Sequence, residues 1–166
     1  MMRHRLAGAS LVVRRAAAAD VPSVVAIERE AFSRPWHRAA FLDLVGAPEA
    51  IFLVAEGPDA TIAGYAVVYV AADHSELANL AVAVHARGWG LGRHLLEKAM
   101  ESARARGARQ MFLEVRESND RAQALYTSVG FLAVARRRHY YEEPVEDALV
   151  LRLDLSLAAP QTREGP

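Results

Sequence analysis

One part of the sequence limits the fold more than any other: a predicted strand over Glu76–Val84 that is almost wholly apolar from Leu77 onward. A strand that is apolar on both faces is expected at the centre of a sheet, covered above and below. Leu91–Arg106 predicts a long helix, because apolar side chains recur on one face and charged ones on the other. Met111–Val115 predicts the next strand, so these segments form a β-α-β unit with a right-handed parallel crossover.

Shorter patterns in the rest of the chain predict further strands and helices around this unit. Apolar alternation predicts strands at Leu11–Arg14, Ile51–Glu56, Ala63–Val70, Phe131–Arg136 and Asp147–Leu155. Helical spacing and capping residues predict helices from Asp20 to about Phe32, from after Trp36 to about Leu44, and from a cap at Ser118 or Asn119 to Gly130. Helices on both sides of a mixed sheet place the chain in the α/β class, which some schemes call α+β.

The length of the chain predicts a single domain. It has 166 residues, enough to bury a core without disulfides or metal. We expect residues 1–10 to form a flexible N-terminal extension, residues 11–156 the domain, and residues 157–166 a disordered tail. No stretch approaches the roughly 18 to 20 apolar residues of a membrane span, and the N-terminal residues lack the apolar region of a secretory signal. We therefore expect a cytoplasmic protein with no membrane partner.

Charge and composition exclude several classes of function. The 20 basic and 20 acidic side chains give a formal net charge of zero, which argues against nucleic-acid binding by bulk attraction. The sequence contains no cysteine, which excludes disulfides, thiolate metal sites and a cysteine nucleophile. None of the six histidines forms a close ligand pair with another, so we expect no metal.

The bend that joins the apolar strand to the long helix, Arg87–Arg93, has glycine at three alternate positions. Glycine lets the backbone approach a ligand closely, and the N-terminus of the following helix attracts anions. A dinucleotide-binding G-x-G-x-x-G would need glycine where Arg93 stands, and a P-loop would need lysine and then serine or threonine where Arg93 and His94 stand. The bend suits a phosphate-bearing ligand of another class, or it is only a tight turn.

Three polar residues farther along the chain each have a functional and a structural interpretation. Glu114, in an otherwise apolar strand, either faces solvent or lines a cleft where desolvation raises its pKa toward that of a useful base. Asn119 is most simply a helix cap. Tyr126 lies on the apolar face of its helix, where a core tyrosine is the default. The order in which they occur is more informative than any one of them.

From about Val13 to Leu155, the order of motifs resembles the GNAT superfamily of N-acetyltransferases, in particular its RimI type, which acetylates the N-terminal alanine of a small-subunit ribosomal protein. The resemblance rests on Ile27-Glu28 through Phe32-Ser33-Arg34-Pro35-Trp36, Asn79-Leu80-Ala81-Val82, Arg87-Gly88-Trp89-Gly90-Leu91-Gly92, Leu113-Glu114-Val115-Arg116-Glu117-Ser118-Asn119 with Ala124-Leu125-Tyr126 and Gly130-Phe131, and Arg137-Arg138-His139-Tyr140-Tyr141 with Glu146-Asp147-Ala148. It implies a mixed, mostly antiparallel central sheet with helices on both faces.

The resemblance also implies roles for individual residues. Those assigned to acetyl-CoA, the only cosubstrate implied, are Leu80, Ala81 and Val82 for the pantetheine arm, Arg87, Gly88, Trp89, Gly90, Leu91, Gly92 and Arg93 for the pyrophosphate, and Asn119 near the thioester. Those assigned to the peptide groove are Phe32, Pro35, Trp36, Tyr140 and Tyr141. Glu114 would be the general base toward the substrate amine, and Tyr126 would donate a proton to the departing CoA thiolate.

The sequence departs from the RimI pattern in two places. Val84 stands where a proline is usual, and Glu142-Glu143 precede Pro144 where a proline is usual directly after the two tyrosines. The second departure places acids beside the expected peptide groove. We therefore expect a basic cofactor side at Arg87 and Arg93 and an acidic substrate side at Glu142, Glu143, Glu146 and Asp147.

The function implied is transfer of an acetyl group from acetyl-CoA to the α-amine of a protein N-terminus, led by alanine and ribosomal, by direct attack in a ternary complex. Two alternatives stay open: a small-molecule amine acetyltransferase and a non-catalytic CoA-binding module. An association with the tRNA threonylcarbamoyl machinery is compatible with the resemblance. The protein would be a monomer or a weak dimer. We expect no direct contact with nucleic acid.

Overall fold

The computed structural model describes residues 3–6 and 9–156. The strands are β1 (Arg3–Leu6), β2 (Ala9–Arg15), β3 (Ala50–Glu56), β4 (Ile62–Ala71), β5 (His74–Val82), β6 (Gln110–Arg116), β7 (Leu132–Glu142) and β8 (Val145–Asp154). The helices are α1 (Val21–Ala31), α2 (Arg38–Leu44), α3 (Leu91–Ala105) and α4 (Asp120–Ser128), with 3₁₀ turns η1 (Ala18–Asp20) and η2 (Val84–Ala86). Apart from the far end of β7, the predicted helices and strands of the domain therefore lie where the sequence patterns indicated, within a few residues.

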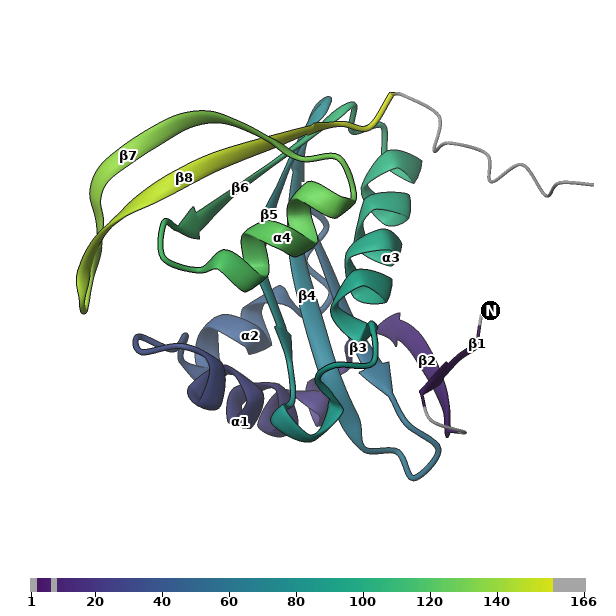
Figure 1. Ribbon diagram of the computed structural model, residues 1–166. Helices are drawn as coiled ribbons and strands as arrows, with labels where there is room; N and C mark the ends of the chain where they lie inside the picture. Colours follow the sequence, from purple (N-terminus) through teal and green to yellow (C-terminus); the bar gives the residue numbers. More distant parts are fainter. Residues whose placement is uncertain (1–2, 7–8, 157–166) are drawn as a thin grey trace, which may run out of the picture.

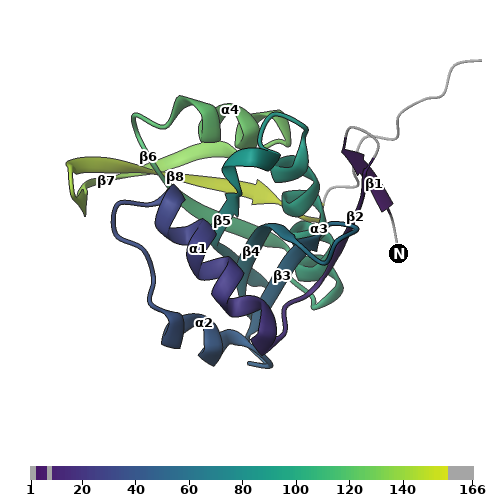
Figure 2. The same ribbon diagram turned by 90° about the horizontal axis from the view of Figure 1, so that it is seen from below.

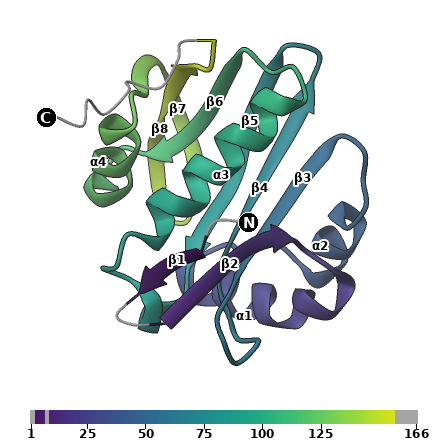
Figure 3. The ribbon, with the colours of Figure 1, turned by 90° about the vertical axis from the view of Figure 1, so that its right-hand side faces the viewer.

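The strands form one sheet in the order β1-β2-β3-β4-β5-β6-β8-β7. Neighbouring strands are antiparallel except for β5 and β6, which the crossover helix α3 joins in parallel. Figure 2 shows α1 and α2 on one face of the sheet, and Figure 3 shows α3 and α4 over the other. The predicted fold class, a mixed and mostly antiparallel sheet with helices on both faces, is confirmed.

Each face of the sheet has its own apolar core. On the α1/α2 face the buried side chains include Val24, Phe41 and Tyr65, and the Phe41 and Tyr65 rings meet edge to face with centroids 5.6 Å apart. On the α3/α4 face they include Leu96 and Leu113. Because burial of apolar area is the main favourable term in folding, these two layers fix the sheet between the helices and hold its strand ends in place.

β5 and β6 pair only at their beginnings and then separate, as Figure 1 shows. Their register pairs His74, Ser75 and Glu76 with Gln110, Met111 and Phe112, and it does not extend to later residues of either strand. The later half of β5 still pairs with β4 on its other edge. The predicted strand ends earlier than expected, at Val82: Ala81 and Ala83 are buried, whereas Val84 is 59% exposed because it lies in the 3₁₀ turn η2 and not in the sheet.

α1 begins as predicted, directly after Asp20 and with Pro22 in its first turn, but the Asp20 side chain does not cap it. The carboxylate instead accepts hydrogen bonds from the Ala17 backbone N–H (2.7 Å) and from both ends of the Arg14 guanidinium (2.7 and 2.8 Å). The pKa of Asp20 is lowered chiefly by the Arg14 hydrogen bonds. Asp20 therefore fastens the start of α1 to β2.

The two ends of the domain extend farther than the patterns predicted. β7 continues to Glu142 through a polar run, with a register irregularity and a positive φ of 51° at His139, so apolar alternation could not have indicated it. In the segment expected to be an extension, residues 3–6 form β1, which pairs with β2. The tail expected at residues 157–166 lies outside the described residues, as do residues 1–2 and 7–8.

Candidate active site

The glycine-rich bend enters α3 with its backbone open to one side. Gly88 and Gly90 have φ angles of +86° and +81°, which L side chains rarely adopt. A Cβ built at either position would meet no heavy atom within 4 Å. The first helical hydrogen bond runs from the His94 N–H to the Gly90 carbonyl, so the N–H groups of the preceding residues have no partner within the helix. The bend therefore has the space and donors that an anionic group requires.

The charged and large side chains of the bend differ in their contacts and in their exposure to solvent. Arg87 donates from Nε to the Val82 carbonyl (3.0 Å), which fastens the bend to the end of β5. Arg93 pairs at the surface with Glu97, one turn along α3 (3.1 Å). Trp89 is 55% exposed, whereas Leu91 is buried in the core. Leu91 can therefore face a ligand only through its backbone.

The strand expected to receive the pantetheine arm lies where β5 and β6 separate. Leu80, Ala81 and Val82 pair with β4 on one edge, while the register with β6 on the other edge has already ended at Glu76. Ala81 is buried, and Leu80 and Val82 are half-buried. Because a strand edge offers a row of N–H and C=O groups, this one can bind an extended chain that enters between the two strands.

Glu114 lies on β6 beside the same gap and faces α1 and α2. Its neighbours Leu113 and Val115 are buried on the α3/α4 face, and strand side chains alternate between faces. Its side chain is 17% exposed, and the nearest cation is Arg137 Nε, 3.5 Å from Oε1. Desolvation raises the pKa of Glu114, the neighbouring Glu76 raises it further, and Arg137 opposes both. Of the two interpretations of Glu114, a carboxylate that lines a cleft agrees with this geometry.

Tyr126 approaches from the other face of the sheet, on α4. Its ring meets Phe131 edge to face at 5.7 Å and packs against the core under α3 and α4. Burial raises the pKa of the phenol to about 12, with a smaller contribution from Tyr141. The hydroxyl therefore stays protonated throughout the physiological range, as a proton donor must.

Asn119 is the N-cap of α4, the simpler of its two predicted interpretations. Its Oδ1 accepts a hydrogen bond from the Ala122 backbone N–H at 3.1 Å. The cap occupies this oxygen, so any contact of Asn119 with a cofactor would have to use the amide nitrogen.

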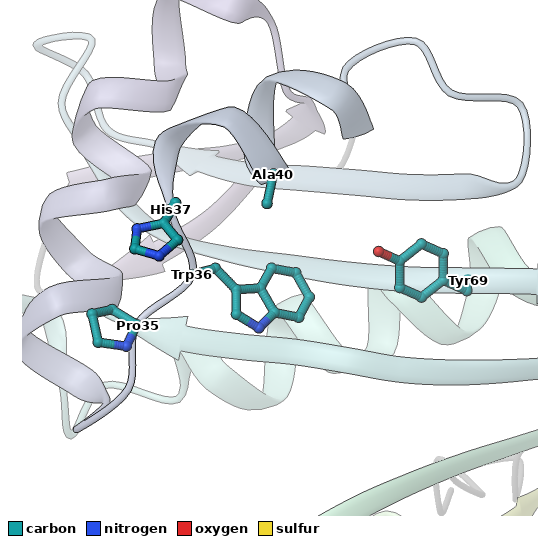
Figure 4. Close-up of a pocket in the computed structure, with 5 residues that line it drawn as sticks. All are labelled: Pro35, Trp36, His37, Ala40 and Tyr69. Carbon is teal, nitrogen blue, oxygen red and sulfur yellow. The ribbon is translucent and has the colours of Figure 1, made fainter.

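A pocket of about 310 Å³ opens on the α1/α2 face, between the loop after α1 and the middle of the sheet. It is lined by Pro35, Trp36, His37, Ala40 and Tyr69. Figure 4 shows the Trp36 indole and the Tyr69 ring on opposite sides of it, one from the loop and one from β4. Pro35 and Trp36 thus lie together as expected, whereas Phe32, 39% exposed, is not among the lining residues.

Tyr140 and Tyr141 lie near the tip of the β7–β8 hairpin. Their rings meet edge to face at 5.0 Å, and the Arg116 guanidinium lies 4.2 Å from the centre of the Tyr141 ring. Burial raises the pKa of both phenols, and Glu114 contributes to each shift. The hairpin therefore brings both tyrosines toward the candidate base.

The hairpin tip is joined to the loop after α1. The Ser33 hydroxyl donates to the Glu143 carbonyl (2.7 Å), and Arg34 pairs with Glu142. These two contacts bring together segments more than 100 residues apart in the sequence. The Glu142 carboxylate and the Glu143 backbone carbonyl therefore hold the loop beside the pocket.

Sequence reasoning missed a buried carboxylate that supports this loop. Glu28, 1% exposed on α1, accepts hydrogen bonds from the Trp36 backbone N–H (3.0 Å), from Asn79 Nδ2 (2.7 Å) and from the Tyr65 hydroxyl. Glu28 belongs to a segment that carried the family resemblance but was given no role, although it is an acid on the helix face of Val24 and Ile27. Glu76 and Tyr69, which pair across β4 and β5, were also missed, since each looks like an ordinary strand residue.

Within the described residues, no group of three or more His, Cys, Asp or Glu side chains is arranged to hold a metal ion. None of the helices in the same part of the chain is both long and apolar enough to cross a membrane.

Comparison with known proteins gives consistent relatives. The model of the family described as "Acetyltransferase (GNAT) family" matches residues 21–131. The ribosomal protein bS18-alanine N-acetyltransferase of Escherichia coli (strain K12) is 35% identical over 140 residues, which cover 83% of this chain and 93% of that protein. The enzyme of the same name from Haemophilus influenzae is 30% identical over 143 residues, 84% of this chain and 96% of that protein.

Solved structures agree with the sequence relatives. The crystal structure of the ribosomal-protein-S18-alanine N-acetyltransferase from Escherichia coli superposes with a TM-score of 0.81 at 31% identity, covering 91% of this chain and 97% of that chain. A structure of Ard1 from Thermoplasma volcanium, at 23% identity and a TM-score of 0.79, shares the fold. The chain belongs to the GNAT family of acetyltransferases.

Proposed function

We propose that this protein is an N-terminal protein acetyltransferase that moves an acetyl group from acetyl-CoA to the α-amine of an alanine-led ribosomal protein. The observation that carries the proposal is a candidate base and a candidate acid on opposite faces of the sheet: Glu114 faces α1 and α2, and Tyr126, on α4, packs against the other face. The bS18-alanine N-acetyltransferases that match nearly their whole length to this chain support the choice of substrate.

The residues present fit acetyl-CoA. The positive-φ glycines Gly88 and Gly90 leave room for the pyrophosphate above the N-terminus of α3, where backbone N–H groups and the helix dipole favour anions. The free edge of β5 at Leu80–Val82 suits the amide groups of pantetheine. The acetyl thioester that acetyl-CoA supplies would then lie in the gap between β5 and β6.

In the transfer step, the amine attacks the acetyl carbon, a C–N bond forms, and the C–S bond breaks. Glu114 accepts the proton that the amine loses, directly or through a water molecule, and its raised pKa makes it a stronger base than an exposed glutamate. Tyr126 donates its phenolic proton at the position of the leaving sulfur and is protonated again from solvent. The sequence contains no cysteine, so direct attack in a ternary complex needs no thiol acyl-enzyme.

The pKa of the amine to be acetylated favours a protein N-terminus over a lysine side chain as the substrate. An α-amine has a pKa of about 7.7 to 8.0, so roughly a tenth is neutral at pH 7. A lysine amine with a pKa of about 10.4 is neutral in less than about one part in a thousand. A carboxylate base such as Glu114 is therefore adequate for the first amine and poorly matched to the second.

The test is an acetyl-transfer assay with a panel of peptides that differ in their first two residues, with polyamines and aminoglycosides as competing acceptors. We expect turnover on alanine-led peptides, and a loss of kcat of roughly 100-fold or more in Glu114→Gln and in Tyr126→Phe. Acetylation of small amines alone would overturn the choice of substrate. Unchanged rates in both variants would overturn the assignment of roles.

Three finer expectations stay predictions: the cytoplasmic location, the association with the tRNA threonylcarbamoyl machinery and the oligomeric state. Sedimentation of the purified protein alone and with that machinery would decide the last two.

A further inference from the structure

The carboxylate of Glu76 has no part in the mechanism described so far, yet it lies beside the candidate base. Glu76 pairs in register with Phe112 at the last point where β5 and β6 are joined, and Glu114 is two residues farther along β6. Paired residues of neighbouring strands share a face of the sheet, as do residues two apart on one strand. Glu76 and Glu114 therefore lie on the same face, at the start of the gap.

The surroundings of this pair explain why its charges interact. Glu76 is close enough for its charge to raise the pKa of Glu114. Glu114 is the more sheltered of the two, with a side chain 17% exposed, so the charge of Glu76 is only partly screened from it. The register and the shared face place the two carboxyl groups near each other.

The other groups that face Glu114 come from β7. Arg137 lies 3.5 Å away and favours the ionised carboxylate. Tyr140 and Tyr141 lie close enough for the charge of Glu114 to affect their own ionisation, and both stay neutral near pH 7. On β8 the residue directly opposite Glu114 is the apolar Val150. Beyond desolvation, the largest effects on the pKa of Glu114 come from one acid, Glu76, which raises it, and one base, Arg137, which lowers it.

We propose that Glu76 is a positioning residue for acetyl transfer: it forms a carboxyl pair with Glu114 on this face of the sheet and favours proton uptake by Glu114, while Arg137 acts in the opposite sense. The inference rests on the proposed function only in treating Glu114 as the base. Within the catalytic cycle, the second carboxylate favours proton uptake at Glu114, because the proton that leaves the amine relieves the repulsion between the two charges.

The direct test is ¹³C NMR of the full-length protein labelled at the glutamate carboxyl carbon, with the Glu114 resonance assigned by its loss in Glu114→Gln. In Glu76→Gln we expect the titration midpoint of Glu114 to fall by about 0.5 pH unit, the effect of a unit charge about 5 Å away in a water-like dielectric. In Arg137→Gln we expect the midpoint to rise by a similar amount. Two shifts of opposite sign could not come from general loosening of the sheet.

A matched control is Glu49→Gln. Glu49 is exposed and influences Tyr69, the cross-strand neighbour of Glu76, but it does not contribute to the shift of Glu114. Removing its charge should leave the Glu114 midpoint unchanged. An equal fall in this variant would overturn the pair, since the effect would then be one of overall charge.

A kinetic measurement links the pair to the reaction. The acidic limb of the kcat profile reports the base in the ternary complex, so it should move to lower pH in Glu76→Gln and to higher pH in Arg137→Gln. A Glu114 midpoint that stays in place in Glu76→Gln would overturn the inference even in a fully active enzyme. A wild-type protein without transferase activity would overturn the proposed function instead, and the NMR midpoints would still decide whether the pair exists.

Discussion

Replacement of Glu28 by alanine removes a carboxylate that holds the wall of the pocket to the sheet. Three donors lose their acceptor: the Tyr65 hydroxyl, Asn79 Nδ2 and the Trp36 backbone N–H. Tyr65 is fully buried, so water cannot replace the lost partner, whereas Asn79 and Trp36 are half-buried and can be resolvated. We expect the variant to lose stability and the loop after α1 to lose its position.

The magnitude follows from these three contacts. An unsatisfied buried donor costs about 1–3 kcal/mol, which sets the contribution of Tyr65. Each of the two resolvated donors adds about 0.5 kcal/mol, and loss of the packed side-chain methylenes adds about 1 kcal/mol. The sum is about 3–5 kcal/mol, which for a domain of this size lowers Tm by roughly 6–20 °C.

Urea unfolding and calorimetry of the wild type and of Glu28→Ala measure this loss. The control is Glu30→Ala, an exposed acid on the same helix, which should change the free energy of unfolding by no more than about 0.5 kcal/mol. In a double-mutant cycle with Tyr65→Phe we expect a coupling of about 1 kcal/mol or more, because removing both partners leaves no orphaned hydroxyl. A loss below about 1 kcal/mol in Glu28→Ala would refute the reasoning.

Three further predictions address the cofactor bend, the acid and the loop contact. Gly90→Ala should raise the KM for acetyl-CoA at least about 10-fold, because the added methyl group fills the space of the ligand. Gly46→Ala, at a similar positive φ, should leave this KM unchanged. Equal effects of the two substitutions would point to backbone strain alone. Because the pKa of Tyr126 is about 12, kcat should show no fall below about pH 10.5, and an alkaline limb centred near pH 9 would contradict this role. Arg34→Ala breaks the exposed contact with Glu142, so the free energy of unfolding should change by no more than about 0.5 kcal/mol. The KM for peptides should change, and the KM for acetyl-CoA should not. Unchanged peptide KM values would show that the contact does not shape the groove.

The parts of the fold that local chemistry determines could be predicted from the sequence. α3 has a clear apolar face and ends before Gly107, and α4 begins at the Asn119 cap. Glu114 could be singled out because a carboxylate is unusual among Met, Phe, Leu and Val, and its raised pKa agrees with the expected desolvation. In each case the residues within a few positions carry the information.

Contacts between distant segments could not be predicted in this way. A β-bulge at Ala78 pairs Val67 with Asn79 and Val68 with Leu77, so Leu77 and Asn79 lie on opposite faces of the sheet. Strict alternation would place both on one face. Only the bulge turns Asn79 toward α1 and Glu28, and nothing near it in the sequence indicates a bulge.

The expected division into a basic cofactor side and an acidic substrate side takes a different form in the fold. Glu146 accepts hydrogen bonds from the Ser118 N–H and Arg116, and Asp147 contacts the His139 N–H and Arg136, so both acids hold the hairpin together. Glu142 is paired with Arg34.

With Glu142, Glu146 and Asp147 held in these contacts, two acids that the sequence did not single out lie near the candidate base and the pocket. Glu76 lies beside Glu114, and Glu49 lies close enough to Tyr69, in the pocket wall, to raise the pKa of its phenol. A protonated N-terminus would be attracted by these charges and would then have to lose its proton next to them. These carboxylates would thus favour binding of the charged amine, and Glu114 among them would accept its proton before attack. Substrate binding and deprotonation would therefore depend on the same group of acidic side chains.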